Sequence, residues 1–318
     1  MMKAIFIDEQ GTEGNMVYGD VEEPEFGPTD ILVRTKAASV NRRDVFTRDG
    51  SHGIKTNGRY VLGMDGAGEV VAVGDLCTKF KVGDRVMGIS NSGTYAEYCR
   101  MPEVTATKIP DFLSYEEAGT FPIILTTAWH MMVCRSGLKA GEDVLVMAAG
   151  SGVGTAAIQI AKLFSGRVFT TASTEDKLEK AKALGADVGI NYTKIPDFSE
   201  AIKAETNGEG VNLVVDHIGS TVWDQCFASM KRGGRFVTCG VSAGHWVNFH
   251  MGRLWTRDLT IIGTSMNPRE DIETIGDLVR RGHFKAAVSE VFPLQQALKA
   301  QHVLEESSFF GKVMLSIP

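Results

Sequence analysis

The hydrophobic pattern of the chain changes near Leu138. Before this residue, short apolar runs are separated by turn residues, and the clearest runs are KAIFID, DILVRTKAASV, AGEVVAVG and TYAEYC. Runs of this length between Gly, Pro, Asp and Asn predict strands. After Leu138, apolar runs alternate with amphipathic segments of helical period, which predicts βαβ units and a parallel sheet. The fold class expected is α/β, with a β-rich part and a doubly wound part.

The doubly wound part contains six predicted strands, DVLVMA, RVFTTA, VGIN, LVVDHI, GRFVTCG and LTIIGT. Helices are expected between them, for example at 155–164, where the apolar positions have helical spacing, and at 174–184, where Thr174 is a suitable N-cap and Gly185 a suitable end. The alternation of strands and helices predicts a sheet with helices on both faces.

The C-terminal stretch contains two predicted helices, at 269–281 and 294–304, and two predicted strands, VSEVF and GKVMLSI. We expect this stretch to complete the β-rich part. The predicted domains are therefore residues 1–121 with 267–318, and residues 122–266, and the chain length of 318 residues suits two domains.

The segment DVLVMAAGSGVGTAAIQIAK has the features of a dinucleotide-binding turn. A buried strand, a glycine-rich turn and a helix in this order direct backbone N–H groups at the helix N-terminus towards a pyrophosphate. The strict G-x-G-x-x-G frame would put its first two glycines at Ala149 and Ser151, so the spacing is unusual, and a tight turn in another α/β protein is the alternative. The predicted cofactor contacts here are Gly150, Ser151, Gly152, Val153 and Gly154.

The end of the second predicted strand distinguishes NAD from NADP. An acidic residue there would bind the ribose 2′-hydroxyl of NAD, but this strand ends at Ala172 and Ser173. The Ser173 hydroxyl and the Lys177 ammonium suit a 2′-phosphate, so NADPH is the expected cofactor. Glu175 and Asp176 lie close by, and Lys177 as a solvated helix residue is the alternative.

Charge and cysteine content narrow the class of partner. A net charge of −6 and a pI near 5.7, without a sustained Lys/Arg run, predict neither a nucleic-acid nor an anionic-membrane partner. No stretch approaches the roughly 18 apolar residues of a membrane span, and the N-terminal residues do not resemble a secretory signal. The five cysteines form no C-x-x-C pair, which indicates neither a disulfide framework nor a structural zinc site. We expect a cytoplasmic protein that acts on a small molecule.

Several short blocks occur in a fixed order along nearly the whole chain: AASVNRRDVFTRDG, LGMDGAGEVVAVG, VGDRVMG, TYAEYC, TTAW, AAGSGVGTAAIQIAK, LGAD, INY, VVDHIG, GGRFVTCG and GKVML. In this order and spacing they resemble the medium-chain dehydrogenase/reductase superfamily, and within it the zinc-free, quinone oxidoreductase-like branch. The resemblance implies a Rossmann domain that binds NADP and a β-rich, GroES-like catalytic domain.

The resemblance also implies roles for individual residues. Around the adenosine 2′-phosphate it places Ser173, Lys177 and Tyr192, although a tyrosine after a short strand is often simply packed. Beside the pyrophosphate, ribose or nicotinamide it places Thr127, His217, Gly240 and Val241.

The main departure from the zinc-dependent relatives concerns the metal ligands. Those relatives carry a cysteine where this chain has Asn41, and a His-Glu pair where it has Met64 and Asp65. Catalytic zinc normally takes three protein ligands, and a methionine thioether suits Cu(I) better than zinc. The remaining ligand-type residues considered, His52, His130 and Cys134, are scattered. We therefore expect no metal site.

Without a Lewis acid, nothing stabilises the alkoxide needed for alcohol oxidation. Hydride addition to a conjugated carbonyl or quinone does not need a metal ion, because neutral hydrogen-bond donors can stabilise the developing enolate. Asn41 is the candidate donor, and Asp44 is the acidic member of the family's N-x-x-D block. The alternatives are that Asn41 satisfies a turn and that Asp44 caps a helix. Phe46 stands where quinone-reductase relatives often have tyrosine, which removes one hydroxyl donor.

Two further functions remain open at this point: an enoyl-thioester reductase of the same superfamily, and a protein that binds NADPH without turnover. The last strand of the doubly wound part, LTIIGT, is apolar and is expected at a sheet edge. Exposed edges of this kind favour pairing with another chain, so a homodimer or homotetramer is expected.

Overall fold

The computed structural model describes residues 1–11, 15–265 and 268–318, and the chain divides into two compact units. The first unit comprises Met1–Ile123 and Pro268–Pro318, and the second comprises Ile124–Asn267. The domain boundaries expected from the sequence, after residue 121 and before residue 267, fall within two residues of these. Within the described residues, no helix has both the length and the apolar character to cross a membrane.

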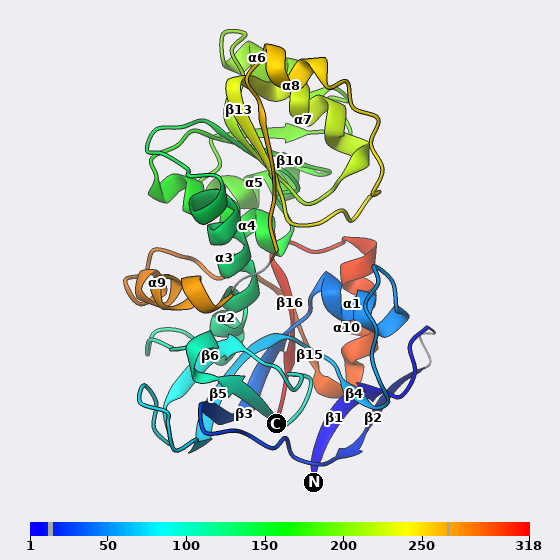
Figure 1. The fold of residues 1–318 in the computed structure, drawn as a ribbon, viewed down its shortest axis with the longest axis vertical. Coiled ribbons are helices and arrows are strands. Elements are labelled where there is room, and N and C mark those ends of the chain that lie inside the picture. Colours follow the sequence, from blue (N-terminus) through cyan, green and yellow to red (C-terminus); the bar gives the residue numbers. More distant parts are fainter. Residues whose placement is uncertain (12–14, 266–267) are drawn as a thin grey trace. The chain divides into compact units, whose positions relative to one another are not determined.

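The larger sheet of the first unit has the strand order β15-β16-β3-β5-β6-β8 in its described part, with β7 also paired to β3 (Figure 1). The C-terminal strand β16 pairs antiparallel with β3 and parallel with β15, so the last strand of the chain lies in the β-rich unit. The bounds of these strands are β3 Asp30–Ser39, β5 Asp65–Val73, β6 Arg85–Ile89, β7 Tyr98–Pro102, β8 Ala106–Lys108, β15 Val288–Pro293 and β16 Lys312–Ser316.

A smaller sheet of the first unit has the order β2-β1-β4. One apolar core joins it to the larger sheet and to a C-terminal helix, through residues such as Ile7, Val40, Leu304 and Leu315. The strands are β1 Met2–Ile7, β2 Met16–Val21 and β4 Tyr60–Val61. The helices are α1 Arg42–Asp49, α2 Tyr115–Gly119, α9 Pro268–Arg280 and α10 Ala297–Glu306, with short 3-10 turns at Glu103–Thr105 and Leu294–Gln296.

The predicted strand TYAEYC starts four residues too early. The strand β7 begins at Tyr98, because the chain before it is held by contacts other than those of the β3–β7 ladder. The Thr94 hydroxyl donates to the Asp65 carbonyl at 3.1 Å, and the Tyr95 carbonyl accepts from the Ile5 N–H at 2.8 Å. Alternating residue types alone did not reveal these long-range bonds.

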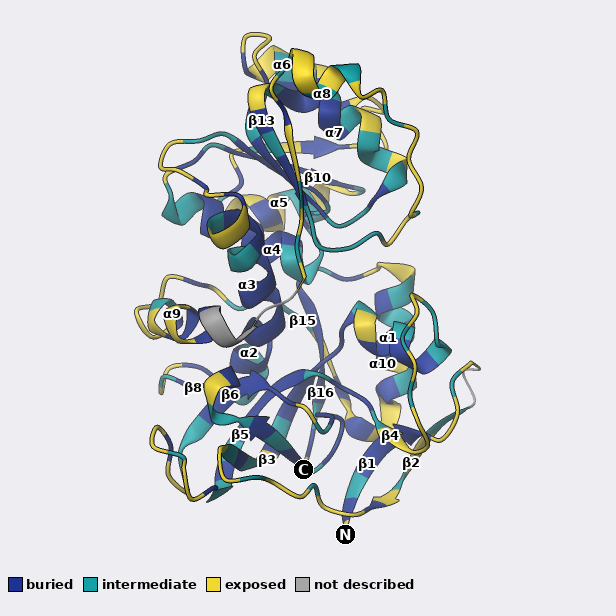
Figure 2. Ribbon diagram, viewed as in Figure 1, coloured by how far each residue is buried: buried dark blue, intermediate teal, exposed yellow. Residues whose placement is uncertain are grey.

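The second unit contains a parallel sheet of the order β11-β10-β9-β12-β13-β14 in the described residues. Its central strands are buried (Figure 2), as their apolar sequences predict for a sheet covered on both faces. The strands are β9 Val144–Val146, β10 Val168–Ala172, β11 Val188–Asn191, β12 Val211–Asp216, β13 Met230–Thr238 and β14 Thr260–Gly263.

Helices connect the strands of this sheet. They are α4 Gly152–Leu163, α5 Glu175–Ala183, α6 Phe198–Glu205, α7 Trp223–Ser229 and α8 Gly252–Thr256, with a 3-10 turn at Ser220–Val222. Before the sheet, helix α3 Phe121–Trp129 continues into a π-helical segment, His130–Arg135. The strand order reverses direction at β9, because β10 and β12 lie on its two sides. In open α/β sheets, ligands bind beyond the carboxyl ends of the strands at such a point.

Candidate functional site

Most of the predicted cofactor residues follow the carboxyl ends of neighbouring strands in the second unit. Residues 150–154 follow β9, Ser173 follows β10 and Tyr192 follows β11. On the other side of β9, His217 follows β12, and the pair Gly240 and Val241 comes after β13. Since all strands of this sheet are parallel, these residues share one edge. That edge is where a doubly wound sheet binds a dinucleotide.

The glycine-rich turn is closed at the start of α4. Ser151 is the N-cap of this helix, and its side-chain oxygen accepts from the Gly154 N–H at 2.9 Å. Ala148 has a φ of 52°, in the left-handed region. A Cβ at Gly154 would lie 2.3 Å from the Ala148 carbonyl oxygen, so only glycine fits there. The first-turn N–H groups of a helix have no intrahelical acceptors, which suits this turn to a pyrophosphate.

His217 lies against the same turn. One of its ring nitrogens, Nε2, is 2.9 Å from Ser151 Oγ, so β12 and β9 bring these two predicted residues together. The preceding residue, Asp216, is buried, and its carboxylate accepts from the backbone N–H groups of Ile218 and Gly219. Burial raises the pKa of Asp216 to about 6. Asp216 therefore shapes the turn that carries His217, a role the sequence did not indicate.

The predicted adenosine end contains an acid that is already bound to a lysine. Glu175 accepts from Lys194 Nζ at 2.6 Å and from Asn191 Nδ2 at 2.9 Å, and the pKa of its carboxyl is lowered chiefly by the bond from Lys194. Lys177 lies in the first turn of α5, where burial lowers the pKa of its ammonium. Tyr192 is 46% exposed. Lys177 and Tyr192 follow Glu175 and Asn191 closely in the chain, and the charge of the Glu175 carboxylate is balanced by Lys194.

Two predicted residues lie in other surroundings. Thr127 is a buried residue of α3, outside the loops that follow the strands. Gly240 lies in the loop after β13, and a Cβ built there would meet no heavy atom of the described residues within 4 Å. The contacts of Thr127, Gly240 and Val241 with a cofactor remain predictions.

In the first unit, Asn41 belongs to a buried polar cluster, which we call the Lys312 cluster. The Lys312 ammonium donates to the Asn41 side-chain oxygen at 2.7 Å and to the Val40 carbonyl at 2.8 Å. The Asn41 amide in turn donates to Asp65 Oδ1 at 2.8 Å. Asp65 also accepts from the Ser39 hydroxyl and from the Ile123 N–H. Asn41 thus bridges a buried cation and a buried anion.

Asp44 adjoins this cluster and also closes the start of α1. Its Oδ2 accepts from the Asn41 backbone N–H at 2.9 Å and from the Tyr95 hydroxyl at 3.1 Å. The first of these bonds is the capping contact that the sequence left open as an alternative. Burial, aided by the charge of Asp65, raises the pKa of Asp44 to about 7, although the Asn41 N–H, Lys312 and the Tyr95 hydroxyl oppose the shift.

The other members of the cluster are shifted in the directions expected for buried ions. Burial raises the pKa of the Asp65 carboxyl, although Lys312, Ser39 and Asn41 oppose the shift. Burial lowers the pKa of the Lys312 ammonium, and the charges of Asp65 and Asp44 oppose that shift. Each charge in the cluster therefore depends on its partners.

A pocket of about 210 Å³ opens beside Asp44 within the first unit. Its wall combines residues of α1 with residues that flank β4, β5 and β6. Most of its side chains are polar, and Met64 is one of the few apolar ones. The lining residues are Arg43, Asp44, Thr47, Tyr60, Leu62, Gly63, Met64, Ser90, Asn91 and Gly93.

Sequence reasoning missed the ionic partners of Asn41. Lys312 lies in the block GKVML, which was considered only as a terminal strand. The available signal was a lysine at the start of the apolar strand KVMLS, whose first four residues are buried. A lysine is rarely buried unless it is paired. The sequence marks Asp65 only as a replaced zinc-ligand position and predicts Tyr95 only as part of a strand.

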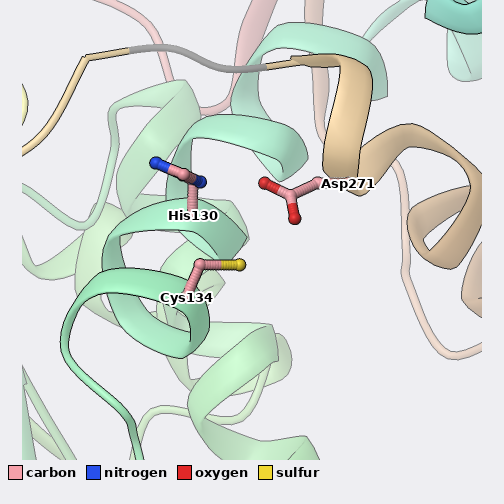
Figure 3. A group of neighbouring side chains, drawn as sticks. All are labelled: His130, Cys134 and Asp271. Carbon is pink, nitrogen blue, oxygen red and sulfur yellow. The ribbon is translucent and has the colours of Figure 1, made fainter.

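Two of the ligand-type residues considered from the sequence, His130 and Cys134, share one element, and His52 lies elsewhere. His130 and Cys134 lie four residues apart on the π-helical segment of the second unit, and Figure 3 draws them with Asp271 of α9, a helix of the first unit. The ring of His52 stacks on that of Phe46, with centroids 3.7 Å apart. Because these residues belong to different units, the expected absence of a metal site remains a prediction.

Comparison with known families accounts for most of both units. The zinc-binding dehydrogenase family matches residues 152–281, and the alcohol dehydrogenase GroES-like domain matches residues 27–111. The human quinone oxidoreductase is 27% identical, with coverage of 99% of this chain and 98% of the human protein. A mycocerosic acid synthase-like polyketide synthase of Mycobacterium tuberculosis is 30% identical over 94% of this chain, which spans only 15% of that longer protein.

Several solved structures match this chain from end to end. One is an NAD-dependent alcohol dehydrogenase, 38% identical, with a TM-score of 0.93 and coverage of 100% of both chains. Another is a mycobacterial protein complexed with NADPH, 30% identical, with a TM-score of 0.90 and the same coverage. With the parallel sheet, the glycine-rich turn and the β-rich unit, these matches show that the chain belongs to the medium-chain dehydrogenase/reductase superfamily of oxidoreductases.

Proposed function

We propose that this protein is an NADPH-dependent oxidoreductase that transfers hydride to a conjugated carbonyl or a quinone without zinc. The observation that carries the proposal is the Lys312 cluster. The Asn41 side chain, which stands at a zinc-ligand position of related enzymes, accepts from the Lys312 ammonium at 2.7 Å. The first unit thus supplies its own buried cation at this position.

The Lys312 cluster disfavours a metal ion in two ways. A Zn²⁺ ion at Asn41 would lie next to the Lys312 ammonium, and like charges repel strongly in a buried site. The donor set is also poor, because the Asn41 oxygen and the Asp65 carboxylate already accept hydrogen bonds from protein groups. The Met64 thioether is a weak zinc ligand.

The second unit supports the choice of cofactor. Its glycine-rich turn, its reversal of strand order and its N-capped helix α4 fit a nicotinamide dinucleotide. Ser173 and Lys177 would hold the 2′-phosphate, while Glu175 is neutralised by Lys194. A 30% identical mycobacterial protein binds NADPH, whereas the 38% identical relative is described as NAD-dependent, so the preference for NADPH needs a direct test.

When bound, the reduced nicotinamide supplies a hydride. The residues of the first unit would then handle charge and protons on the substrate: donors in the pocket hold the carbonyl oxygen, and Asp44 gives a proton to the reduced product. A carboxyl whose pKa is about 7 is present in both protonation states near neutral pH, which suits proton transfer. Asn41 would act by fixing the Lys312 cluster behind this pocket.

An NADPH-consumption screen tests the proposal. The panel contains quinones, enones, enoyl thioesters and aldehydes, and the protein is treated with a chelator and checked for residual metal by mass spectrometry. We expect turnover with enones or quinones in the metal-free protein. A rate that disappears with the chelator and returns only with zinc would contradict the zinc-free mechanism.

The same screen separates the two alternatives left open by the sequence. A strong preference for enoyl thioesters would identify a thioester reductase. Tight NADPH binding with no consumption across the panel would identify a binding protein. For cellular location we propose the cytoplasm, on the cysteine pattern of the sequence.

A further inference from the structure

Helix α1 carries three arginines, which differ in their partners. Arg48 Nη1 donates to Gln301 Oε1 at 2.9 Å, and Arg42 Nη2 donates to Ser307 Oγ at 3.0 Å. Arg43 is exposed and lines the pocket beside Asp44. Within residues 1–11, 15–265 and 268–318, its guanidinium has neither a hydrogen-bond nor an ion-pair partner. Two arginines of the helix are therefore held by protein groups, and the third faces the pocket.

Tyr60 provides a second donor at the same place. It comes from β4, lines the pocket and is 43% exposed. Burial raises the pKa of its phenol, the charge of Asp44 raises it further, and the charge of Arg43 lowers it. The three side chains are therefore within electrostatic reach of one another. No residue in the described part of the chain forms a hydrogen bond with the Tyr60 hydroxyl.

We propose that Arg43 and Tyr60 bind the carbonyl oxygen of the substrate and stabilise the negative charge that develops on it. This inference rests on the proposed function and assigns a cationic donor that the sequence analysis did not consider. A guanidinium presents planar N–H donors to an oxygen and keeps its charge at all relevant pH values. It would supply the positive charge that a zinc ion supplies in other dehydrogenases.

An enone gains its two electrons and its proton in separate steps. Hydride from the reduced nicotinamide brings two electrons to the β-carbon, and the carbon–carbon π pair moves to join the α-carbon to the carbonyl carbon. The carbonyl π pair moves onto oxygen, which becomes the enolate oxygen facing Arg43 and Tyr60. A proton then adds to the α-carbon and restores the carbonyl, so the substrate gains one hydride and one proton in total.

The geometry of the pocket explains why both residues are needed. Arg43 and Asp44 are adjacent in α1, so an anion bound at Arg43 also lies near a carboxyl group. A neutral Asp44 tolerates that anion and can protonate the reduced substrate, whereas a charged Asp44 would repel it. The Tyr60 hydroxyl adds a second hydrogen-bond donor, which is uncharged.

Steady-state kinetics on an active enone or quinone test the assignment. Loss of a donor that acts in the transition state typically lowers kcat by roughly a hundredfold or more. We expect this for Arg43→Gln, a partial recovery in Arg43→Lys, and a loss of about tenfold in Tyr60→Phe, as for a neutral hydrogen bond. The matched control is Arg42→Gln, on the same helix turn but bound to Ser307, and its kcat should stay close to that of the wild type.

A binding measurement keeps the test independent of turnover. 4-Nitrophenol carries an oxygen whose ionisation is visible by absorbance, and its phenolate resembles an enolate. We expect the wild-type protein to bind it as phenolate and to lower its apparent pKa, and Arg43→Gln to abolish this shift. Thermal unfolding of each variant confirms that the exposed substitutions leave the fold intact.

The outcomes separate the two proposals. If the wild type reduces nothing in the panel, the proposed function fails, and the nitrophenol titration still decides whether Arg43 and Tyr60 bind an oxyanion. If the wild type is active but Arg43→Gln keeps its kcat, the role of Arg43 is overturned. The role of Arg43 is also overturned if the wild-type protein leaves the apparent pKa of 4-nitrophenol at its value in free solution.

Discussion

Lys312 and Asn41 are 271 positions apart in the chain, yet their side chains share a hydrogen bond of 2.7 Å within the first unit. The bond joins the final strand β16 to the residue that precedes α1. Because Asn41 also donates to Asp65, the ammonium and the carboxylate are held at opposite ends of one amide. Lys312 is only 5% exposed, so its ammonium and its partners could not be resolvated easily if the bond were broken.

The first prediction follows from that bond. Lys312→Met keeps the length of the side chain but leaves Asp65 and Asn41 without their cation. Leaving buried hydrogen-bond acceptors without their charged donor typically costs about 1–3 kcal/mol or more, so the midpoint of urea unfolding should fall. Lys55→Met, at an exposed position, is the control and should change little. Equal midpoints for the two variants would show that the cluster does not stabilise the fold.

Local sequence patterns predict the second unit well, for a physical reason. The glycine-rich turn is a strand, a turn and a helix in succession, and each has a signal within a few residues. The Ser151 cap and the close approach at Gly154 are consequences of that short segment. The neighbouring loops could be placed at the same edge because parallel strands have their carboxyl ends together.

The Lys312 cluster could not be predicted in the same way. Its members come from residues 39–41, 65 and 312, and they meet because β16 pairs with β3 and β3 pairs with β5. The sequence showed the type of each residue but not the pairing register. Asn41 was expected to face a substrate, and the structure shows it bonded to Lys312 and Asp65, while its neighbour Asp44 lines the pocket.

Two glycines near the cofactor edge should respond differently to alanine. At Gly154 a Cβ would lie 2.3 Å from the Ala148 carbonyl oxygen, so Gly154→Ala should destabilise the second unit by about 1–3 kcal/mol. At Gly240 a Cβ enters open space within the described residues, so Gly240→Ala should leave thermal unfolding unchanged. If the cofactor lies beside Gly240, however, its dissociation constant should rise. Unchanged NADPH binding by Gly240→Ala would remove Gly240 from the predicted site.

We propose that the preference for NADPH depends on the charge of Lys177 at the start of α5. Lys177→Ala should weaken NADPH roughly tenfold to a hundredfold, because a hydrogen bond to a charged group contributes about 1.5–3 kcal/mol. NADH binding should hardly change. Lys180→Ala is the matched control, since that ammonium already pairs with Asp176 at 2.8 Å. Isothermal titration with both cofactors gives the answer, and equal affinity of the wild type for NADPH and NADH would refute the preference.

The edge of the second unit's sheet leads to a proposal about assembly. We propose that β14 pairs with the same strand of a second copy, because in the described residues it ends the strand order and its Ile261 is 41% exposed. Trp255 of the preceding helix α8 is 74% exposed. Ile261→Glu should then yield monomers in sedimentation velocity at micromolar concentration. Leu76→Glu, at a 65% exposed leucine of the first unit, should not change the assembly. A monomeric wild type would exclude this pairing.

The last prediction concerns pH, and it rests on the buried carboxyl of Asp44. Its pKa in the folded protein is about 7, against an ordinary value of 3.8, because burial and the charge of Asp65 outweigh Lys312, the Tyr95 hydroxyl and the Asn41 N–H. Between these two pH values the folded state therefore binds more protons than the unfolded state. The contribution of Asp44 to the free energy of unfolding must then fall as the pH rises from about 4 to about 7.

Asp65 contributes a slope of the same sign, because its pKa is also raised, so the Asp44 part is obtained by difference. Asp44→Asn keeps the size of the side chain and cannot ionise. Its free energy of unfolding should decline less with pH than that of the wild type, by an amount that grows up to about pH 7. We also propose that Asp44 sets the pH profile of the reaction: if neutral Asp44 donates the proton, wild-type kcat/KM should fall above about pH 7. The Asp44→Asn rate should be low and nearly independent of pH across that range. A wild-type profile that stays flat to about pH 9, together with full activity of Asp44→Asn, would show that the proton comes from elsewhere.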